Sequence, residues 1–253
     1  MLRTYIAGEV ATPRQSNLRN LRKMAAGDPY YQFGLKLGEW SFEAGLEMMA
    51  RLVGISPDPG HFYGDDTIDV ELTLDGLDAM AGHLARAAEA KSKVIVATGH
   101  PTGLLPVHVA VAAALRAAGC MVLTPAEGWK YEVPTPDGPR ERKIRYFEDV
   151  AVLSGGGSLH HTHDSAPMEE MLANLAGESR HWPDLVIADH GWAGAAGEAG
   201  ITTVGFADCN DPALFAGHVV GKIDVAVPLD DNVLPRHYAP LTGYLLGRAG
   251  LLA

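Results

Sequence analysis

The feature that most constrains the fold is a series of short apolar runs, each ending in small, polar or acidic residues. The runs are VIVATGH (94–100), MVLTPAEG (121–128), LVIADHG (185–191), TTVGFAD (202–208) and DVAVPLDD (224–231). They do not alternate between apolar and polar residues, which is typical of parallel strands buried on both faces. Stretches with helical spacing separate or follow them. The sequence therefore predicts an α/β fold with an open, mostly parallel, Rossmann-like sheet and right-handed crossovers.

The N-terminal part has a different pattern, because apolar residues recur there at helical spacing. The helices expected there run from Thr12 to Gly27, from Ser41 to Gly54, and onward from Asp69. Thr12, Ser41 and Asp69 would serve as N-caps. Residues 1–90 are therefore predicted to form a helical layer or cap on an α/β catalytic region, residues 91–253, within one compact domain. A β-hairpin excursion is expected around the turn 134–140, which contains Asp137-Gly138.

Composition excludes some functions. The chain has 253 residues, a net charge of −11 and a pI near 5.4. This argues against nucleic acid as a main partner, since phosphate backbones are bound by clustered Lys and Arg. A small phosphorylated metabolite stays compatible with the charge. No run of about 18 apolar residues exists and the N-terminus lacks an apolar signal core, so we expect no membrane association and a cytoplasmic protein. A homodimer is expected from base rates alone.

Acids and histidines gather where the predicted strands end. In an open parallel sheet, ligands bind beyond the carboxyl ends of the strands. Those ends carry His100, Glu127, Asp189, His190, Asp208, Asp230 and Asp231. Carboxylates from different strands together with an amide suit a divalent metal, with Mg²⁺ or Mn²⁺ preferred and Zn²⁺ as an alternative. We expect the ligands to come from Asp189, Asp208, Asn210 and Asp230. Asp211, before Pro212, has the pattern of an ordinary helix cap, and a cap is also the competing interpretation of Asp189.

The loop Thr98–Gly103 joins the first predicted strand to a helix. Its glycines permit close backbone approach, and a helix N-terminus offers free N–H groups to an anion. Thr98, Gly99, Thr102 and Gly103 are therefore predicted to bind the substrate phosphate, with Glu127 nearby. A structural turn is the competing interpretation. The loop matches neither GxxxxGK nor GxGxxG, which argues against ATP and NAD.

The stretch 154–168, SGGGSLHHTHDSAPM, is the richest in imidazoles. His161 or His163 could act in proton transfer together with His100 and His190, while a solvated loop is the alternative. The run Gly155–Gly157 would be a hinge that lets the loop close over the sheet edge.

Several phosphatase mechanisms lack their signatures. Asp189 is not followed by a second Asp two residues later, as an aspartyl-phosphate enzyme requires. Neither Cys120 nor Cys209 has an Arg six residues on, and no Arg-His-Gly is present. Phosphoryl transfer would then depend on metal-assisted attack by water.

The motifs ATGHPTGLLP, SGGGSLHHTHDS, DLVIADHGWAGAAGEAGI, GFADCNDPALF and VPLDDNV together resemble a bacterial family labelled "phosphatase". The resemblance runs from about Gly64 to the C-terminus and transfers no catalytic residue. The arrangement of strand-end acids under a helical cap is also similar, in architecture alone, to the metal-dependent damage-control phosphatases.

The prediction is a metal-dependent phosphatase that hydrolyses a phosphomonoester of a small metabolite, such as a sugar phosphate or nucleotide. The alternatives are a metal-independent enzyme similar to phosphosugar isomerases, with a His or Glu127 base, and a non-catalytic module that binds a phosphorylated metabolite.

Overall fold

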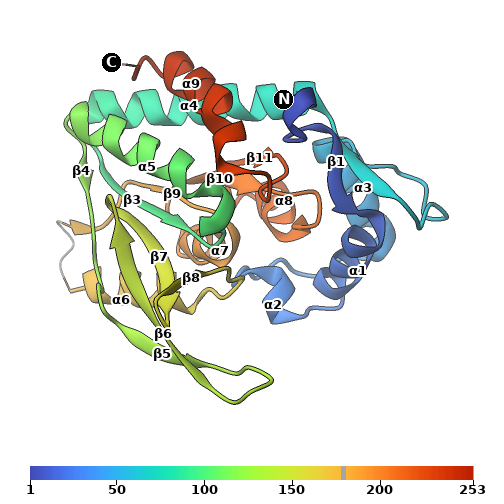
Figure 1. Cartoon of the computed structure of the whole chain (residues 1–253), viewed down its shortest axis with the longest axis horizontal. Helices are drawn as coiled ribbons and strands as arrows, with labels where there is room; N and C mark the ends of the chain where they lie inside the picture. The colour runs from blue at the N-terminus through green and yellow to red at the C-terminus, as the bar shows by residue number, and fades with distance from the viewer. Residues whose placement is uncertain (178–180, 253) are drawn as a thin grey trace.

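The computed structural model describes residues 1–177 and 181–252, and it confirms the α/β prediction. Nine strands form one mixed, mostly parallel sheet in the order β11-β10-β9-β3-β7-β6-β5, while β4 pairs with β3 and β8 with β7 (Figure 1). Its strands are β3 (Lys93–Thr98), β4 (Met121–Val122), β5 (Lys130–Val133), β6 (Arg140–Phe147), β7 (Val150–Gly155), β8 (Ser158–His160), β9 (Leu185–Ile187), β10 (Thr203–Ala207) and β11 (Val225–Pro228). The neighbouring strands β3, β9, β10 and β11 are parallel, so their carboxyl ends meet at one edge.

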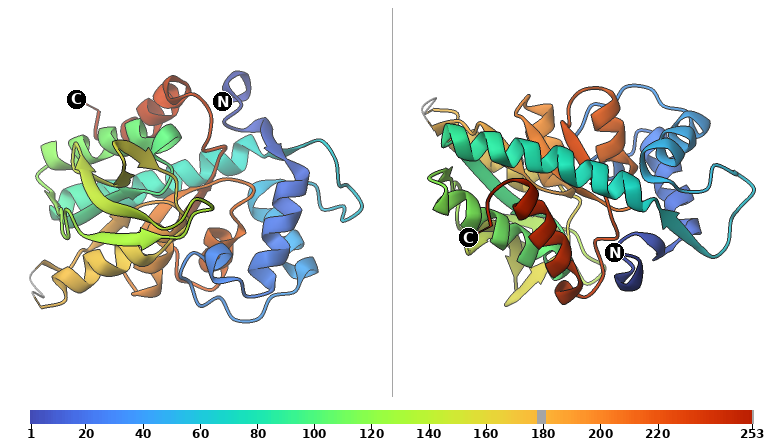
Figure 2. Two further views of the ribbon diagram at one scale, coloured as in Figure 1. Left: turned by 60° about the horizontal axis from the view of Figure 1, so that its bottom comes forward. Right: turned by 90° about the horizontal axis from the view of Figure 1, so that it is seen from above.

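Helices cover both faces of the central parallel strands, which explains why β3, β9 and β10 are buried almost throughout. Along β3, Val94 and Val96 pack in one core cluster with α4, α5 and α9, while Ile95 and Ala97 pack in the other with α6, α7 and α8. The long helix α4 and the C-terminal α9 lie side by side on the first face (Figures 1 and 2). These helices are α4 (Val70–Ala90), α5 (Pro101–Ala117), α6 (Ala166–Leu175), α7 (His190–Glu198), α8 (Pro212–Val219) and α9 (Ala239–Arg248), with the 3₁₀ helix η3 (Pro235–Tyr238) before α9.

The N-terminal part is less uniformly helical than predicted. After η1 (Leu2–Thr4), the strand β1 (Gly8–Pro13) pairs antiparallel with β2 (Asp65–Ile68) in a separate two-stranded sheet. Thr12 therefore lies in a strand and is not the expected N-cap, and α1 (Arg14–Ala25) begins after Pro13 with no side-chain cap. The helices α2 (Pro29–Gln32) and α3 (Phe42–Val53) follow. The caps predicted for the next two long helices are confirmed, since the side chains of Ser41 and Asp69 accept N–H bonds in the first turns of α3 and α4.

The predicted hairpin is confirmed as β5 and β6, and a turn at Glu148 and Asp149 leads on to β7. The run from Met121 is a strand for only two residues. The expected glycine hinge has another form, because Gly155 ends β7 and Gly156 and Gly157, both with positive φ, make the turn into β8.

Across the described ranges, every helix falls short of the length or the apolarity needed to cross a membrane.

Candidate functional site

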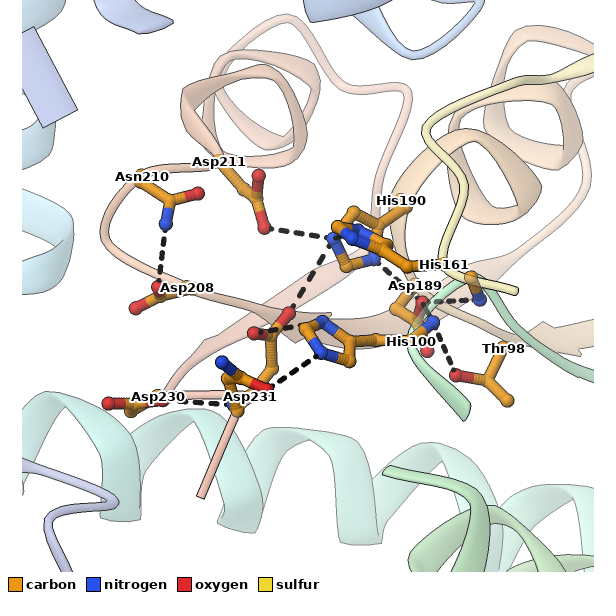
Figure 3. A network of polar contacts seen from close by, with 12 residues as sticks. Thr98, His100, His161, Asp189, His190, Asp208, Asn210, Asp211, Asp230 and Asp231 are labelled. Atoms are coloured by element: carbon orange, nitrogen blue, oxygen red, sulfur yellow. Dashed lines mark hydrogen bonds and ion pairs between the residues drawn. The ribbon is translucent and has the colours of Figure 1, made fainter. Parts of the chain in front are cut away.

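The carboxyl ends of β3, β9, β10 and β11 open onto a cavity of about 870 Å³. This volume is in the range that holds a small metabolite. The polar groups of its wall include two sets, which come from different strand ends. We call Asp208, Asp230 and Asp231 the acid cluster, and His100, His161 and His190 the imidazole cluster (Figure 3). In each set, ligand atoms of the three residues lie within 4.8 Å of one another.

The acid cluster is buried and is held by neutral donors. The Oδ2 atom of Asp208 accepts from the Thr12 hydroxyl at 2.8 Å and from the amide nitrogen of Asn210 at 2.9 Å. Asn210 thus orients a cluster member through its nitrogen, whereas the sequence suggested its carbonyl oxygen as a metal ligand. Oδ1 of Asp230 accepts the Asn232 N–H at 2.9 Å. Burial and the charges of Asp231 and Asp230 raise the pKa of Asp208 well above its usual value.

Asp189 lies beneath the imidazole cluster and does not line the cavity. Its side chain is fully buried, and Oδ1 accepts the Gly99 N–H at 2.6 Å, the His100 N–H at 3.2 Å and Nδ1–H of His190 at 2.8 Å. Although burial opposes ionisation, the hydrogen bond and charge of His190 lower the pKa of Asp189 to about 2. The arrangement fits a residue that orients His190 and the loop after β3, rather than the metal ligand predicted.

His190 is the centre of the polar network. Its Nε2 atom lies 3.3 Å from Asp211 Oδ2, 3.6 Å from Asp231 Oδ2 and 3.3 Å from His161 Nε2. Burial disfavours the charged imidazole, but the carboxylates of Asp211, Asp189 and Asp231 raise the pKa of His190 to about 10.

The other two members of the imidazole cluster differ in charge. Nδ1 of His100 lies 3.1 Å from Oδ1 of Asp231. Burial lowers the pKa of His100, but the Asp231 carboxylate outweighs this effect and the pKa is raised. Burial, reinforced by the charges of His190 and His100, lowers the pKa of His161 to about 4. The cluster therefore combines His190 and His100, whose protonated forms are favoured, with His161, whose neutral form is favoured.

The histidine-rich loop contributes His161 alone to this cavity. His163 stacks on Tyr30 with ring centroids 4.7 Å apart and lines a second cavity of about 550 Å³. Burial, with the charges of His190 and His161, lowers the pKa of His163 to about 2. His160 bonds the Gly155 carbonyl within the hairpin. His161 is thus the histidine of this loop that lines the first cavity, while His163 lies behind it with its ring centroid 5.0 Å from that of His190.

The predicted phosphate loop has a structural role in most of its residues. Thr98 is buried and its hydroxyl accepts the His100 N–H, while the Gly99 N–H is bound by Asp189. A Cβ on Gly103 would lie 1.9 Å from the Asp231 carbonyl oxygen, so that glycine permits the first turn of α5 to pack closely against the loop after β11. Thr102 lines the cavity. Glu127 is exposed beyond the short β4 and lines neither cavity.

Asp211 and Asp231 are functional candidates that sequence reasoning missed. Asp211 occupies the N-cap position of α8, yet its side chain makes no capping bond and points at His190. Burial raises the pKa of Asp211 to about 6. Asp231 was placed at a strand end without a role, although it contacts both His100 and His190. A missing side-chain cap is visible only in three dimensions, so the sequence held no signal for Asp211.

The chemistry of the donor set fits a divalent cation. Four carboxylates line the cavity, and among the described residues that line it none is Lys or Arg. Buried atoms without a hydrogen-bond partner include Asp231 Oδ2 and Asp211 Oδ1. Buried carboxylates are stable only when paired with a cation, a donor or a proton. The acid cluster could hold a hard cation through oxygen ligands.

The fold and site together define a class of protein, an α/β protein with an acidic, imidazole-walled cavity at the carboxyl edge of its sheet. A family model described as Phosphatase matches residues 1–253. A protein named Phosphatase SCO2771, from Streptomyces coelicolor, is 52% identical over 254 residues, which cover 99% of this chain and 94% of the relative. The chain therefore belongs to the Phosphatase family, and the resemblance found in its motifs is confirmed over its full length. Membership supports hydrolysis of phosphate esters.

Proposed function

We propose that the protein is a divalent-metal-dependent phosphatase that hydrolyses a phosphomonoester of a small metabolite in the cavity of about 870 Å³. The observation that carries this proposal is the charge of the cavity wall. Asp208, Asp211, Asp230 and Asp231 line it, with no Lys or Arg among the described lining residues. A phosphate dianion would be repelled by such a wall unless cations lay between them.

The residues that would hold the cation are Asp208, Asp230 and Asp231. A divalent ion there would supply a Lewis acid for a phosphoryl oxygen and would lower the pKa of a water molecule. Thr12 and Asn210 keep Asp208 aimed into the cavity by donating to its Oδ2 atom.

The imidazole cluster, which adjoins the acid cluster at Asp231, would bind the phosphoryl group beside the cation. Neighbouring carboxylates raise the pKa of His190 to about 10 and also raise the pKa of His100, which favours the protonated form of both imidazoles. Their positive charge would complement the charge that develops on the transferring group. His161, which is neutral, is suited to accept a proton.

The test is release of inorganic phosphate from a panel of sugar phosphates and nucleotides. The protein is assayed as purified, after EDTA treatment, and after addition of Mg²⁺, Mn²⁺ or Zn²⁺. We expect EDTA to abolish turnover and one of the ions to restore it. Turnover that survives complete removal of metal would contradict the proposal.

A matched pair of variants localises the ion. Asp208→Asn should lower kcat by more than about 100-fold, which corresponds to roughly 3 kcal/mol of transition-state stabilisation. Asp184→Asn is the control, because Asp184 precedes β9 at the opposite edge of the sheet and bonds the Lys93 N–H. It should leave kcat within about twofold, the range of an exposed substitution outside the site.

A further inference from the structure

We propose that the imidazole cluster holds a second divalent cation of its own, ligated by His100, His161 and His190, and that Asp231 is shared between this cation and the one at the acid cluster. The inference depends on the proposed function only in assuming the cation at the acid cluster. In this proposal, a metal ion takes the place of the protons on the imidazole cluster.

The hydrogen bonds at the outer nitrogens of two imidazoles fix where their lone pairs point. Nδ1 of His190 faces the ionised Asp189 at 2.8 Å, so Nδ1 carries the hydrogen. Nε2 of His100 lies 3.2 Å from the Asn232 carbonyl oxygen and is likewise the donor. The lone pairs are then on the inner nitrogens, His190 Nε2 and His100 Nδ1. An oxygen acceptor at the outer nitrogen is the arrangement found behind metal-bound histidines.

Carboxylate oxygens of Asp211 and Asp231 and the ring of His161 face these inner nitrogens. His190 Nε2 lies 3.6 Å from Asp231 Oδ2 and 3.3 Å from His161 Nε2, and His100 Nδ1 lies 3.1 Å from Asp231 Oδ1 (Figure 3). Asp231 Oδ2 and His100 Nδ1 are buried atoms without a hydrogen-bond partner. With the His161 lone pair also directed inward, four ligand atoms converge on a position suited to a cation.

The spacing of these atoms suits a metal ion. Imidazole nitrogens lie about 2.0–2.1 Å from Zn²⁺, so two of them in a tetrahedral shell are about 3.4 Å apart. The separation between His161 Nε2 and His190 Nε2 is 3.3 Å. The backbone of His190 has φ of 50°, a left-handed conformation that residues other than glycine rarely adopt and that holds the ring in place.

The two clusters differ in the ion that they favour. Three imidazoles and one carboxylate suit Zn²⁺ or Mn²⁺, whereas the carboxylates of the acid cluster suit Mg²⁺ or Mn²⁺. Asp231 belongs to the acid cluster and also reaches His100 and His190 through its two oxygens. A shared carboxylate would place the ions roughly 3.5–4 Å apart, as in two-metal phosphatases.

The experiment measures bound metal directly. The full-length protein is stripped of metal with EDTA, reloaded with Mn²⁺ and desalted. The number of bound metal ions per chain is then measured by inductively coupled plasma mass spectrometry. We expect two ions per chain and a spin-coupled electron paramagnetic resonance spectrum. His161→Ala and Asp230→Asn should each retain one ion, and Asp231→Ala should lose both.

His160→Gln is the matched control. It removes the neighbouring imidazole, which bonds the Gly155 carbonyl, and should keep two ions. His161 lies on the cavity wall and keeps an accessible surface, so its substitution should leave the fold intact. His100→Gln gives the same readout if His161→Ala fails to fold.

Each contrary outcome is distinct. A single ion in the unsubstituted protein, with turnover that EDTA abolishes, overturns the second site and leaves the proposed function standing. If both His161→Ala and His100→Gln still bind two ions, the assignment of the imidazoles as ligands is wrong. If two ions bind but show no spin coupling, the assignment of Asp231 as a shared ligand is wrong. No bound ion, together with turnover insensitive to EDTA, overturns the proposed function as well.

Discussion

Replacement of Asp189 by Asn tests whether this carboxylate orients the site or binds metal itself. The carboxylate is fully buried and accepts three hydrogen bonds through Oδ1, from the N–H groups of Gly99 and His100 and from Nδ1 of His190. Asparagine has nearly the same shape and keeps one oxygen acceptor, but it carries no charge. The substitution therefore weakens these bonds without leaving a cavity.

The expected loss of stability follows from the number of bonds. Hydrogen bonds to a charged acceptor contribute about 1.5–3 kcal/mol each, and they are roughly twice as strong as neutral ones. If each of the three bonds loses about half of its strength, the free energy of unfolding falls by about 2–4 kcal/mol. Since the total stability of a domain is about 5–15 kcal/mol, the variant should remain folded.

The expected effect on catalysis is a fall in kcat by about 10–100-fold at saturating metal, the usual effect of losing a partner behind a ligating histidine. The measurements are urea denaturation, phosphate release and bound metal per chain, with Asp184→Asn as the control. The positioning role predicts unchanged metal content when metal is saturating. Loss of a bound ion under that condition, with an unchanged free energy of unfolding, would refute the reasoning and identify Asp189 as a direct ligand.

Three further predictions concern the residues around the site. Tyr238→Phe removes the hydroxyl that donates to the Asp230 carbonyl at 2.7 Å, and denaturant titration should show a loss of about 1–3 kcal/mol; an unchanged midpoint would show that this bond does not hold the acid cluster. The Arg14 guanidinium lies 2.7 Å from the buried carboxylate of Asp66. Arg14→Met removes this ionic partner and should lower the free energy of unfolding by about 3–5 kcal/mol, and a loss below about 1 kcal/mol would contradict the prediction. In metal-free protein, the stability due to His190 is fully present below pH 6.5 and is lost as the pH rises through about 10, because its pKa is raised on folding. Thermal scans should therefore show a melting temperature that falls from pH 6.5 to about 9, and an equal slope in His190→Gln would rule out this origin.

The sheet and the position of the site could be predicted because both depend on local patterns. An apolar run of four to six residues without alternation predicts a parallel strand, and topology then brings the carboxyl ends together. His100, His190, Asp208 and Asp230 were placed at the cavity on this basis, and the structure brings them together there.

The roles of individual residues could not be predicted, because they depend on partners distant in sequence. The local sequence predicts that the Gly99 N–H is available to bind phosphate. In the structure this N–H donates to Asp189, which lies 90 positions later in the sequence. A capping acid and a site acid both precede a helix, so Asp211 could not be distinguished from Asp69. Strand β1 pairs with residues more than 50 positions later, which no local pattern reveals.

The family match covers residues 1–253, although the motifs suggested a resemblance only from about Gly64, and residues of the N-terminal segment contact the acid cluster. The Asp230 N–H donates to the Ile6 carbonyl at 2.8 Å, Thr12 donates to Asp208, and Asn20 donates to the Asn210 carbonyl at 2.9 Å. Buried carboxylates repel one another, so a cluster of them keeps its geometry only where neutral donors hold it. Segment 1–25 supplies two such donors to the loop of Asp208 and Asn210, and an acceptor, the Ile6 carbonyl, to the loop of Asp230. The N-terminal segment is therefore part of the construction of the acid cluster.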